Sequence, residues 1–177
     1  RSPSRGLGDV YKRQVTAFLV NLFRAIPFII LIILLIPFTK ALMGTIMGVQ
    51  GALPALIIGA SPFYARLVEI GLKEIDKGVI EAAESMGANT WTIIWKVLIP
   101  ESMPALISGI TVTAIMLVGS TAIAGVIGAG GLGNLAYMVG FTRNQSDVTL
   151  VATIVILIIV FIIQFAGDFL AKAVDKR

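Results

Sequence analysis

The 177-residue sequence contains neither cysteine nor histidine, and only 14% of its residues are charged. Without cysteine, the chain has no disulfide, no thiolate zinc ligand and no cysteine nucleophile. Without histidine, it has neither a Ser-His-Asp triad nor an imidazole metal ligand. It also lacks a G-x-x-x-x-G-K-[ST] loop, so it cannot hydrolyse ATP by that route. We therefore expect no catalytic residue, no cofactor and no metal.

What the sequence does contain is apolar: 57% of its residues are hydrophobic and its mean hydropathy is +0.95. Soluble domains have about 45–50% apolar and about 25% charged residues. A domain of about 150 residues still exposes roughly 30% of its chain surface, so this much apolar surface cannot be hidden from water. The composition predicts an integral membrane protein, and the apolar runs described below make it all-α and polytopic. The length excludes a channel domain combined with a large soluble enzyme.

Residues 1–14 differ in composition from the rest of the chain. They hold four basic residues and one acidic residue, a net charge of +3, whereas the other 163 residues carry ten basic and nine acidic groups. The segment lacks the apolar core of a signal peptide. We expect a foreign or disordered head, followed by a membrane domain over residues 15–177. Because residue 1 is Arg rather than Met, we also expect a fragment or a processed product.

Charge-free runs locate the membrane spans, because a helix needs about 20 apolar residues to cross the hydrocarbon core. Uncharged runs of 25, 41 and 20 residues cover 41–65, 102–142 and 148–167. Only 15 residues separate Arg24 from Lys40, so the first span must begin before Arg24, and Pro27 and Pro37 should kink or end its helix. The glycine-rich half of the longest run predicts a loop or a re-entrant turn after a helix. The predicted spans are 15–38, 48–68, 103–126 and 147–170.

The basic residues predict the orientation, because cytoplasmic loops carry an excess of Lys and Arg. Four spans place both termini on one side, together with most of the basic residues after the head: Arg66, Lys73, Lys77, Lys96, Lys172, Lys176 and Arg177. The opposite loops hold only Lys40 and Arg143. Both termini and segment 66–101 are therefore predicted to be cytoplasmic. Arg66 and Glu69, three residues apart, are expected to form a helical pair.

Segment 66–101 is the one long hydrophilic stretch. Apolar residues recur in it at helical spacing: Val79, Ile80, Ala83 and Met86. This predicts a short amphipathic helix that Gly87 stops, and Thr90 can cap a second short helix bearing two tryptophans. From physics alone, the apolar faces fit the lipid interface and the groove of a partner protein equally well.

Gly128, Gly130 and Gly133 match the dinucleotide-binding pattern G-x-G-x-x-G. The preceding apolar run has the length of a membrane span rather than of a strand, and residues 141–146 do not form the second strand that such a fold needs. The glycines are therefore predicted to allow close helix approach and a tight turn. A membrane dehydrogenase is only a distant alternative.

A longer pattern lies in the hydrophilic stretch. The cytoplasmic signature of bacterial ABC importer permeases is EAA-x3-G-x9-I-x-L-P, and the sequence resembles it over residues 81–100. The residues that match in register are Glu81, Ala82, Ala83, Gly87 and Pro100, while Val97 and Ile99 replace its Ile and Leu. The spacing is long and specific. The resemblance therefore favours docking into a partner over the lipid interface.

Other segments narrow the resemblance to methionine importer permeases, over nearly the whole chain from Val15 to Arg177. These segments are Asn21–Ile30, Pro37–Thr39, Gly128–Gly133 and Ile163–Asp168. Such permeases have five transmembrane helices, with the N-terminus outside and the C-terminus inside. The resemblance implies that the first helix is absent and that residues 1–14 stand where it would end.

The resemblance also implies a mechanism. Two permease copies in the bilayer would form the pathway, and each coupling segment, about residues 71–100, would dock in a cleft of an ABC ATPase subunit. ATP-driven closure of the ATPase pair would move the permeases between inward- and outward-facing states. A periplasmic or lipid-anchored binding protein would deliver D- or L-methionine, and no nucleic acid is involved. Glu81 would orient the coupling helix or pair with a basic group, Ala82 and Ala83 would permit close approach, and Gly87 would permit the turn.

Met116 and Ser120 are candidate pathway residues, because their span is long, bears Gly and Ser, and directly follows the coupling segment. Two alternatives remain open. One is a permease for another small amino acid or an oxyanion. The other is a non-transporting membrane scaffold that recruits a cytoplasmic partner through residues 66–101.

Overall fold

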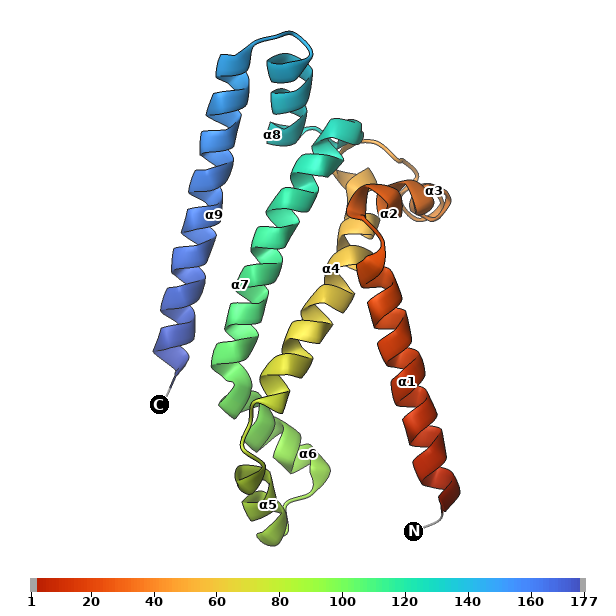
Figure 1. Cartoon of the computed structure of the whole chain (residues 1–177), viewed down its shortest axis with the longest axis vertical. Helices are drawn as coiled ribbons and strands as arrows, with labels where there is room; N and C mark the ends of the chain where they lie inside the picture. The colour runs from red at the N-terminus through yellow and green to blue at the C-terminus, as the bar shows by residue number, and fades with distance from the viewer. Residues whose placement is uncertain (1–2, 176–177) are drawn as a thin grey trace. The chain divides into compact units, whose positions relative to one another are not determined.

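The computed structural model describes residues 3–175, with side chains from Val10 onward, and helix is the regular secondary structure throughout this part (Figure 1). The α-helices and π-helical turns are α1 (Pro3–Ala25), α2 (Phe28–Leu34), α3 (Ile36–Met43), α4 (Gly48–Lys73), α5 (Lys77–Ser85), α6 (Thr90–Ile93), η1 (Ile94–Leu98), α7 (Ile99–Ala124), η2 (Gly125–Ala129), α8 (Gly131–Asn134), η3 (Leu135–Phe141) and α9 (Ser146–Val174). The all-α prediction is confirmed.

The chain forms two compact units. The first combines the chain up to Phe63 with Ser120–Thr149, and the second combines Tyr64–Gly119 with the chain from Leu150 onward. The first unit therefore holds α1, α2, α3, the beginning of α4 and the glycine-rich turn. The second holds the end of α4, the short helices α5 and α6, most of α7 and most of α9.

Three helical stretches are long and apolar enough to cross a membrane: Gly48–Lys73, Thr90–Ala129 and Ser146–Val174. They include the predicted spans 48–68, 103–126 and 147–170. The middle stretch begins earlier than predicted, because α6 and η1 continue directly into α7. Charge-free runs show where a helix can enter the membrane, but a helix continues for as long as its backbone hydrogen bonds do.

The predicted first span, 15–38, is not one straight helix. The chain bends by 103° between Val10–Ala25 and Phe28–Leu34. Pro27 stands at the bend, just before α2, and Pro37 lies in the first turn of α3. A proline has no N–H to donate and its ring clashes with the preceding turn, so each starts a new helix instead of continuing the old one. The expected breaks are confirmed, and the bend is sharper than a kink.

Helix α1 is continuous across residue 14. The change in composition at that residue is therefore not the end of a helix. The division of the chain into a head over residues 1–14 and a membrane domain over residues 15–177 remains a prediction.

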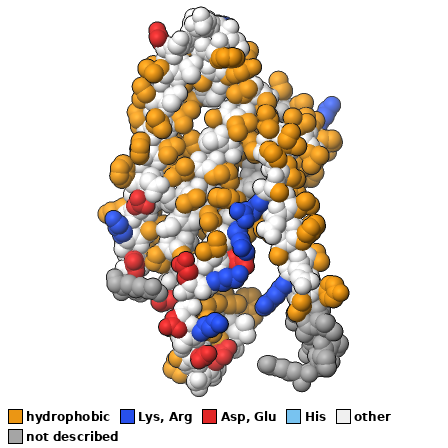
Figure 2. All heavy atoms as spheres, in the orientation of Figure 1, with side chains coloured by type: hydrophobic (Ala, Val, Ile, Leu, Met, Phe, Trp, Pro, Cys, Tyr) orange, Lys and Arg blue, Asp and Glu red, His pale blue; other side chains and the backbone are white. Residues whose placement is uncertain are grey.

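Large apolar side chains cover much of the face shown in Figure 2, as expected for helices that face lipid. Small residues instead hold the second unit together. A Cβ atom at Gly71 would come within 2.8 Å of the Ala105 Cβ, and one at Gly109 would come within 3.3 Å of the Leu67 Cβ. Small residues allow this close backbone approach, which is typical of helix packing in membranes.

The glycine-rich segment forms a tight turn, as predicted. Gly128 and Gly130 have φ values of 114° and 82°, where a side chain would be strained. The turn ends the long helical stretch and starts the short helices α8 and η3. No strand precedes these glycines anywhere between residues 3 and 175. The helix followed by a turn is thus the structure that the sequence predicted.

Candidate functional site

Helix α5 carries most of the EAA pattern, and both of its ends are fixed locally. At its start, the Asp76 carboxylate accepts a hydrogen bond of 2.8 Å from the Gly78 N–H. At its end, the Ala88 N–H donates to the Ala83 carbonyl at 3.1 Å, and the Gly87 N–H donates to the Glu84 carbonyl at 2.9 Å. This pair of bonds is a Schellman motif, and Gly87 supplies its left-handed residue with φ of 80°. Gly87 therefore ends the helix, as predicted.

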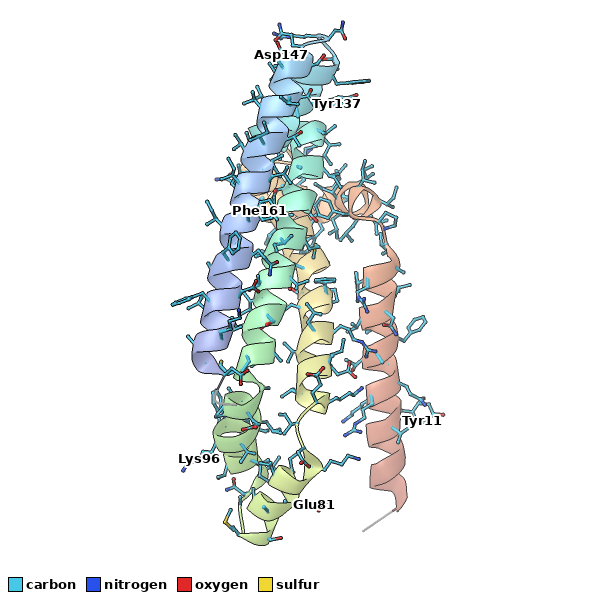
Figure 3. The ribbon with its side chains drawn as sticks, turned by 60° about the vertical axis from the view of Figure 1, so that its left-hand side comes forward. Tyr11, Glu81, Lys96, Tyr137, Asp147 and Phe161 are labelled. Carbon is cyan, nitrogen blue, oxygen red and sulfur yellow. The ribbon has the colours of Figure 1, made fainter. Side chains whose placement is uncertain are left out.

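The EAA residues face in different directions. Ala83 is only 5% exposed, and α5 packs against α6 and η1. Glu81 lies roughly 160° around the helix from Ala83 and is exposed, as is Ala82 (Figure 3). Met86, at the tip, is 82% exposed. Close approach to a partner was expected at both alanines. Ala83 instead packs within its own segment, and Ala82 is exposed and accessible to a partner.

The second short helix is capped by Asn89 and not by Thr90. The Asn89 side-chain oxygen accepts a hydrogen bond of 2.8 Å from the Thr92 N–H, and Thr90 is the first residue of α6. Asn is the stronger N-cap of the two, since its side chain reaches the free N–H groups more readily. Beyond the cap, Trp91 and Trp95 are 71% and 63% exposed. They are the only tryptophans in the sequence.

Pro100 follows the π-helical turn η1 and lies in the first turn of α7. In a regular α-helix its ring would clash with the carbonyl of Lys96, four residues earlier. We attribute the wider turn to this clash, because a π turn shifts the register by one residue. Pro100 also lines a pocket of about 420 Å³ together with three carboxylate residues: Glu74, Glu101 and Asp175. In the described part of the chain, no group of side chains is arranged to hold a metal ion.

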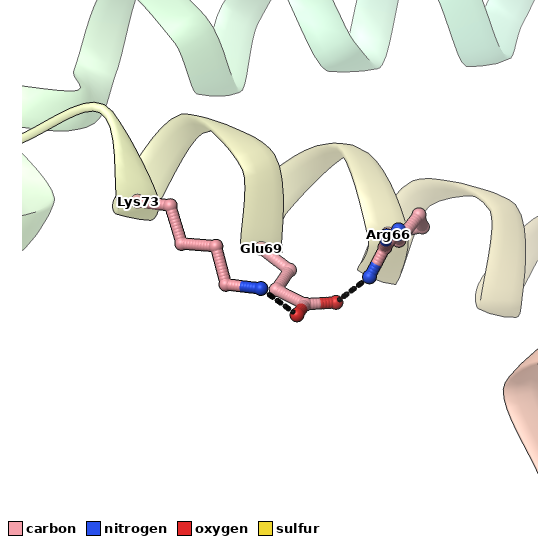
Figure 4. Close-up of polar contacts among 3 residues, drawn as sticks. All are labelled: Arg66, Glu69 and Lys73. Carbon is pink, nitrogen blue, oxygen red and sulfur yellow. Dashed lines mark hydrogen bonds and ion pairs between the residues drawn. The ribbon is translucent and has the colours of Figure 1, made fainter. Parts of the chain in front are cut away.

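The end of α4 that leads into this segment carries a charged triplet (Figure 4). Glu69 accepts from Arg66 at 2.7 Å and from Lys73 at 2.6 Å. The predicted pair of Arg66 and Glu69 is confirmed. The contact of Lys73 was missed, although its spacing of four residues from Glu69 could have indicated it. The triplet balances the Glu69 charge within its own helix.

The two candidate pathway residues lie on α7. Ser120 is 8% exposed and Met116 is half-buried, and both take part in interactions within the chain. A role for them in the pathway remains a prediction.

The sequence model of the family described as "Binding-protein-dependent transport system inner membrane component" matches residues 10–177. The Methionine import system permease protein MetP of Bacillus subtilis is 72% identical over 164 residues, which cover 93% of this chain and 74% of that protein. A probable D-methionine transport system permease protein, MetI of Pasteurella multocida, is 48% identical over 97% of this chain and 81% of its own length.

Two solved transporter structures have a similar fold. An inward-facing conformation of the MetNI methionine ABC transporter superposes with a TM-score of 0.93 at 43% identity, covering 96% of this chain and 79% of that one. An amino acid ABC transporter crystallised with histidines superposes with a TM-score of 0.66 at 25% identity, covering 90% of this chain and 73% of that one. The fold is therefore that of an ABC importer permease.

Proposed function

Since this chain belongs to the family of binding-protein-dependent transport system inner membrane components, we propose that it is the permease of an ATP-driven methionine importer. Two copies form the translocation pathway, and a separate ATPase subunit hydrolyses ATP. A substrate-binding protein supplies methionine at the outer face. The high identity to MetP supports the choice of methionine as the substrate.

The observation that carries the coupling role is the solvent-exposed face of α5. Bonds at Asp76 and Gly87 fix the two ends of this helix, and Ala83 anchors its inner face. The opposite face, with Glu81 and Ala82, is exposed. A short, rigid helix fixed in this way transmits a push from a partner to the spans that flank it, because little of the movement is lost in local bending.

Glu81 lies on that face with two other exposed charged residues of α5, Lys77 and Glu84. Paired with a basic side chain of the ATPase, its carboxylate fixes the orientation of the docked helix. Ala82, beside it, lets the two backbones approach closely. Pro100 and the π turn before it connect the docked helix to α7, which carries the movement toward the pathway.

The proposed orientation places α5 in the cytoplasm together with the C-terminus. The lack of cysteine makes this directly testable, since any introduced cysteine is the sole thiol. Ser85→Cys should resist a membrane-impermeant maleimide in intact cells, and Asn144→Cys should react. The reverse pattern would contradict the orientation.

Transport provides the main test. A permease-null strain, complemented with the full-length permease carrying Glu81→Lys, should take up methionine at least tenfold more slowly at equal membrane abundance. Glu74→Lys makes the same charge reversal within the predicted coupling segment but outside α5, so it separates the exposed face of α5 from the net charge of the segment. Undiminished uptake by the Glu81→Lys variant would refute the coupling role.

Docking can also be measured directly. Because Trp91 and Trp95 are the only tryptophans, the intrinsic fluorescence of the permease reports on α6 and η1 alone. Addition of a tryptophan-free variant of the ATPase should reduce quenching of this emission by iodide, and Glu81→Lys should abolish that reduction. Unchanged quenching of the wild-type permease would show that the tryptophan face lies outside the interface.

A second candidate function is the import of a different amino acid, which the likeness to the transporter crystallised with histidines supports. Competition for uptake separates the two. Excess unlabelled methionine abolishes uptake of labelled methionine under the main proposal, and excess histidine leaves it unchanged.

A further inference from the structure

A mostly apolar pocket of about 110 Å³ lies within the first unit. Its walls come from α2, α3, the connection between α3 and α4, the start of α4, the last residue of α7 and η2. The lining side chains include Ile33, Ile36, Thr39, Met47, Ala52 and Ile127. All but Thr39 are apolar, so the pocket offers one polar side chain in hydrophobic surroundings.

Thr39 is unusual among the helical hydroxyl residues. It is only 3% exposed, and its side chain forms no hydrogen bond within residues 3–175. Three other buried hydroxyl side chains in the helices donate to the carbonyl four residues earlier: Ser102, Thr111 and Thr113. No fully enclosed side-chain oxygen or nitrogen in the described part of the chain lacks a hydrogen bond, so the Thr39 hydroxyl retains some access to the pocket space. It can therefore donate to a ligand that carries a hydrogen-bond acceptor.

We propose that this pocket receives the side chain of methionine during transport, an inference that rests on the function proposed above. An apolar cavity of about 150 Å³ is large enough to bind benzene, so one of about 110 Å³ suits a slender, unbranched side chain. A thioether side chain is flexible and polarisable, and its sulfur is a weak acceptor for the Thr39 hydroxyl. Water fits less well, since a buried water needs two to four polar partners and the lining side chains offer one.

This assignment predicts selectivity. Norleucine has the shape of methionine without the sulfur, so it fills the pocket but leaves Thr39 without a partner. Leucine is branched and shorter, and it fills the pocket poorly. The preferred order is therefore methionine, then norleucine, then leucine.

Photolabelling of the permease–ATPase complex in proteoliposomes tests the site. A diazirine analogue of methionine should label residues 28–52, which contribute most of the pocket wall. Excess methionine should prevent the labelling. The same preparation, supplied with the binding protein and ATP, reports methionine uptake independently.

Two variants sharpen the test, each with a matched control. Ile36→Phe narrows the pocket and should lower labelling at least about tenfold, whereas Leu34→Phe, on an exposed position outside the pocket, should not. Thr39→Val should reduce the preference for methionine over norleucine, measured by competition for the label, by about two- to threefold. Thr113→Val, which removes a hydroxyl already bonded to the Gly109 carbonyl, should leave that preference unchanged.

The outcomes separate the two proposals. Intact uptake with methionine-sensitive labelling only outside residues 28–52 would overturn the pocket and leave the transport function standing. Absence of methionine uptake by the wild-type complex would overturn the function itself. Equal competition by methionine and norleucine in the wild-type complex would refute the contact with Thr39.

Discussion

The helical part of the coupling segment, from Lys77 to Leu98, and the glycine-rich segment, residues 125–141, both consist of short helical pieces, but the ends of these pieces are fixed differently. In the first, α5 and α6 receive side-chain caps from Asp76 and Asn89. In the second, η2, α8 and η3 have no side-chain cap. Side-chain hydrogen bonds therefore fix the starts of α5 and α6 in the coupling segment, and no such bonds fix the starts of η2, α8 and η3 in the glycine-rich segment.

Close packing within the first unit holds the glycine-rich segment. A Cβ atom at Gly125 would come within 2.6 Å of the Gly130 carbonyl oxygen, and one at Gly133 would come within 2.7 Å of the Ala122 Cα atom. A Cβ atom at Gly87, in the coupling segment, would contact nothing within 4 Å. A helix that must present a docking surface is exposed to water and has to be stable by itself. A turn whose glycines pack against neighbouring backbone can rely on those neighbours.

The largest effect that would sharpen this comparison is expected from Gly133→Ala. The added methyl group would press on the backbone at Ala122, which cannot rotate away as a side chain can. We expect a cost of about 3 kcal/mol or more and loss of most of the folded protein. The midpoint of thermal aggregation, followed by fluorescence-detected size-exclusion chromatography in detergent, measures the change.

Gly119→Ala is the matched control for that substitution. Gly119 lies inside α7 with no atom within 4 Å of the added Cβ. Alanine is favoured over glycine inside a helix by about 1 kcal/mol, so the midpoint should stay the same or rise. Equal losses from both substitutions would show that any added methyl group is harmful here, and the contrast between the segments would fail.

A smaller effect is expected from Gly87→Ala in the coupling segment. The cost there comes only from the left-handed backbone, which disfavours an L-residue by about 1–2 kcal/mol. Amide exchange over residues 82–88 should become about 5- to 30-fold faster, with global stability little changed. Hydrogen-exchange mass spectrometry of the detergent-solubilised permease measures this. Unchanged exchange would mean that tertiary contacts, and not the Schellman motif, hold the turn.

The same contrast explains how much the sequence could predict. Three spans follow from charge-free runs, because charge inside hydrocarbon is costly whatever the fold. Gly87 as a helix end follows from local chemistry. By contrast, the size of the bend beside Pro27, 103°, could not be predicted, because a proline indicates only that the helix breaks.

The candidate site was predicted in position and only partly in geometry. The helical spacing placed Ala83 on the apolar face of α5, but it did not show that Val79 and Met86, predicted on the same face, are 41% and 82% exposed. That difference in exposure depends on α6 and η1 packing against one side of α5. The unpartnered hydroxyl of Thr39 could not be predicted either, since helical threonines usually bond to their own backbone.

The smallest effect tests the cap that the sequence assigned to the wrong residue. Asn89→Ala removes the acceptor of the Thr92 N–H and should destabilise α6 by about 1 kcal/mol. Exchange of the Thr92 amide should therefore become about fivefold faster. Thr90→Ala should leave it nearly unchanged, because Thr90 is already inside the helix and alanine is a good helix former. If Thr90→Ala had the larger effect, the cap would be Thr90 and α6 would begin one residue later.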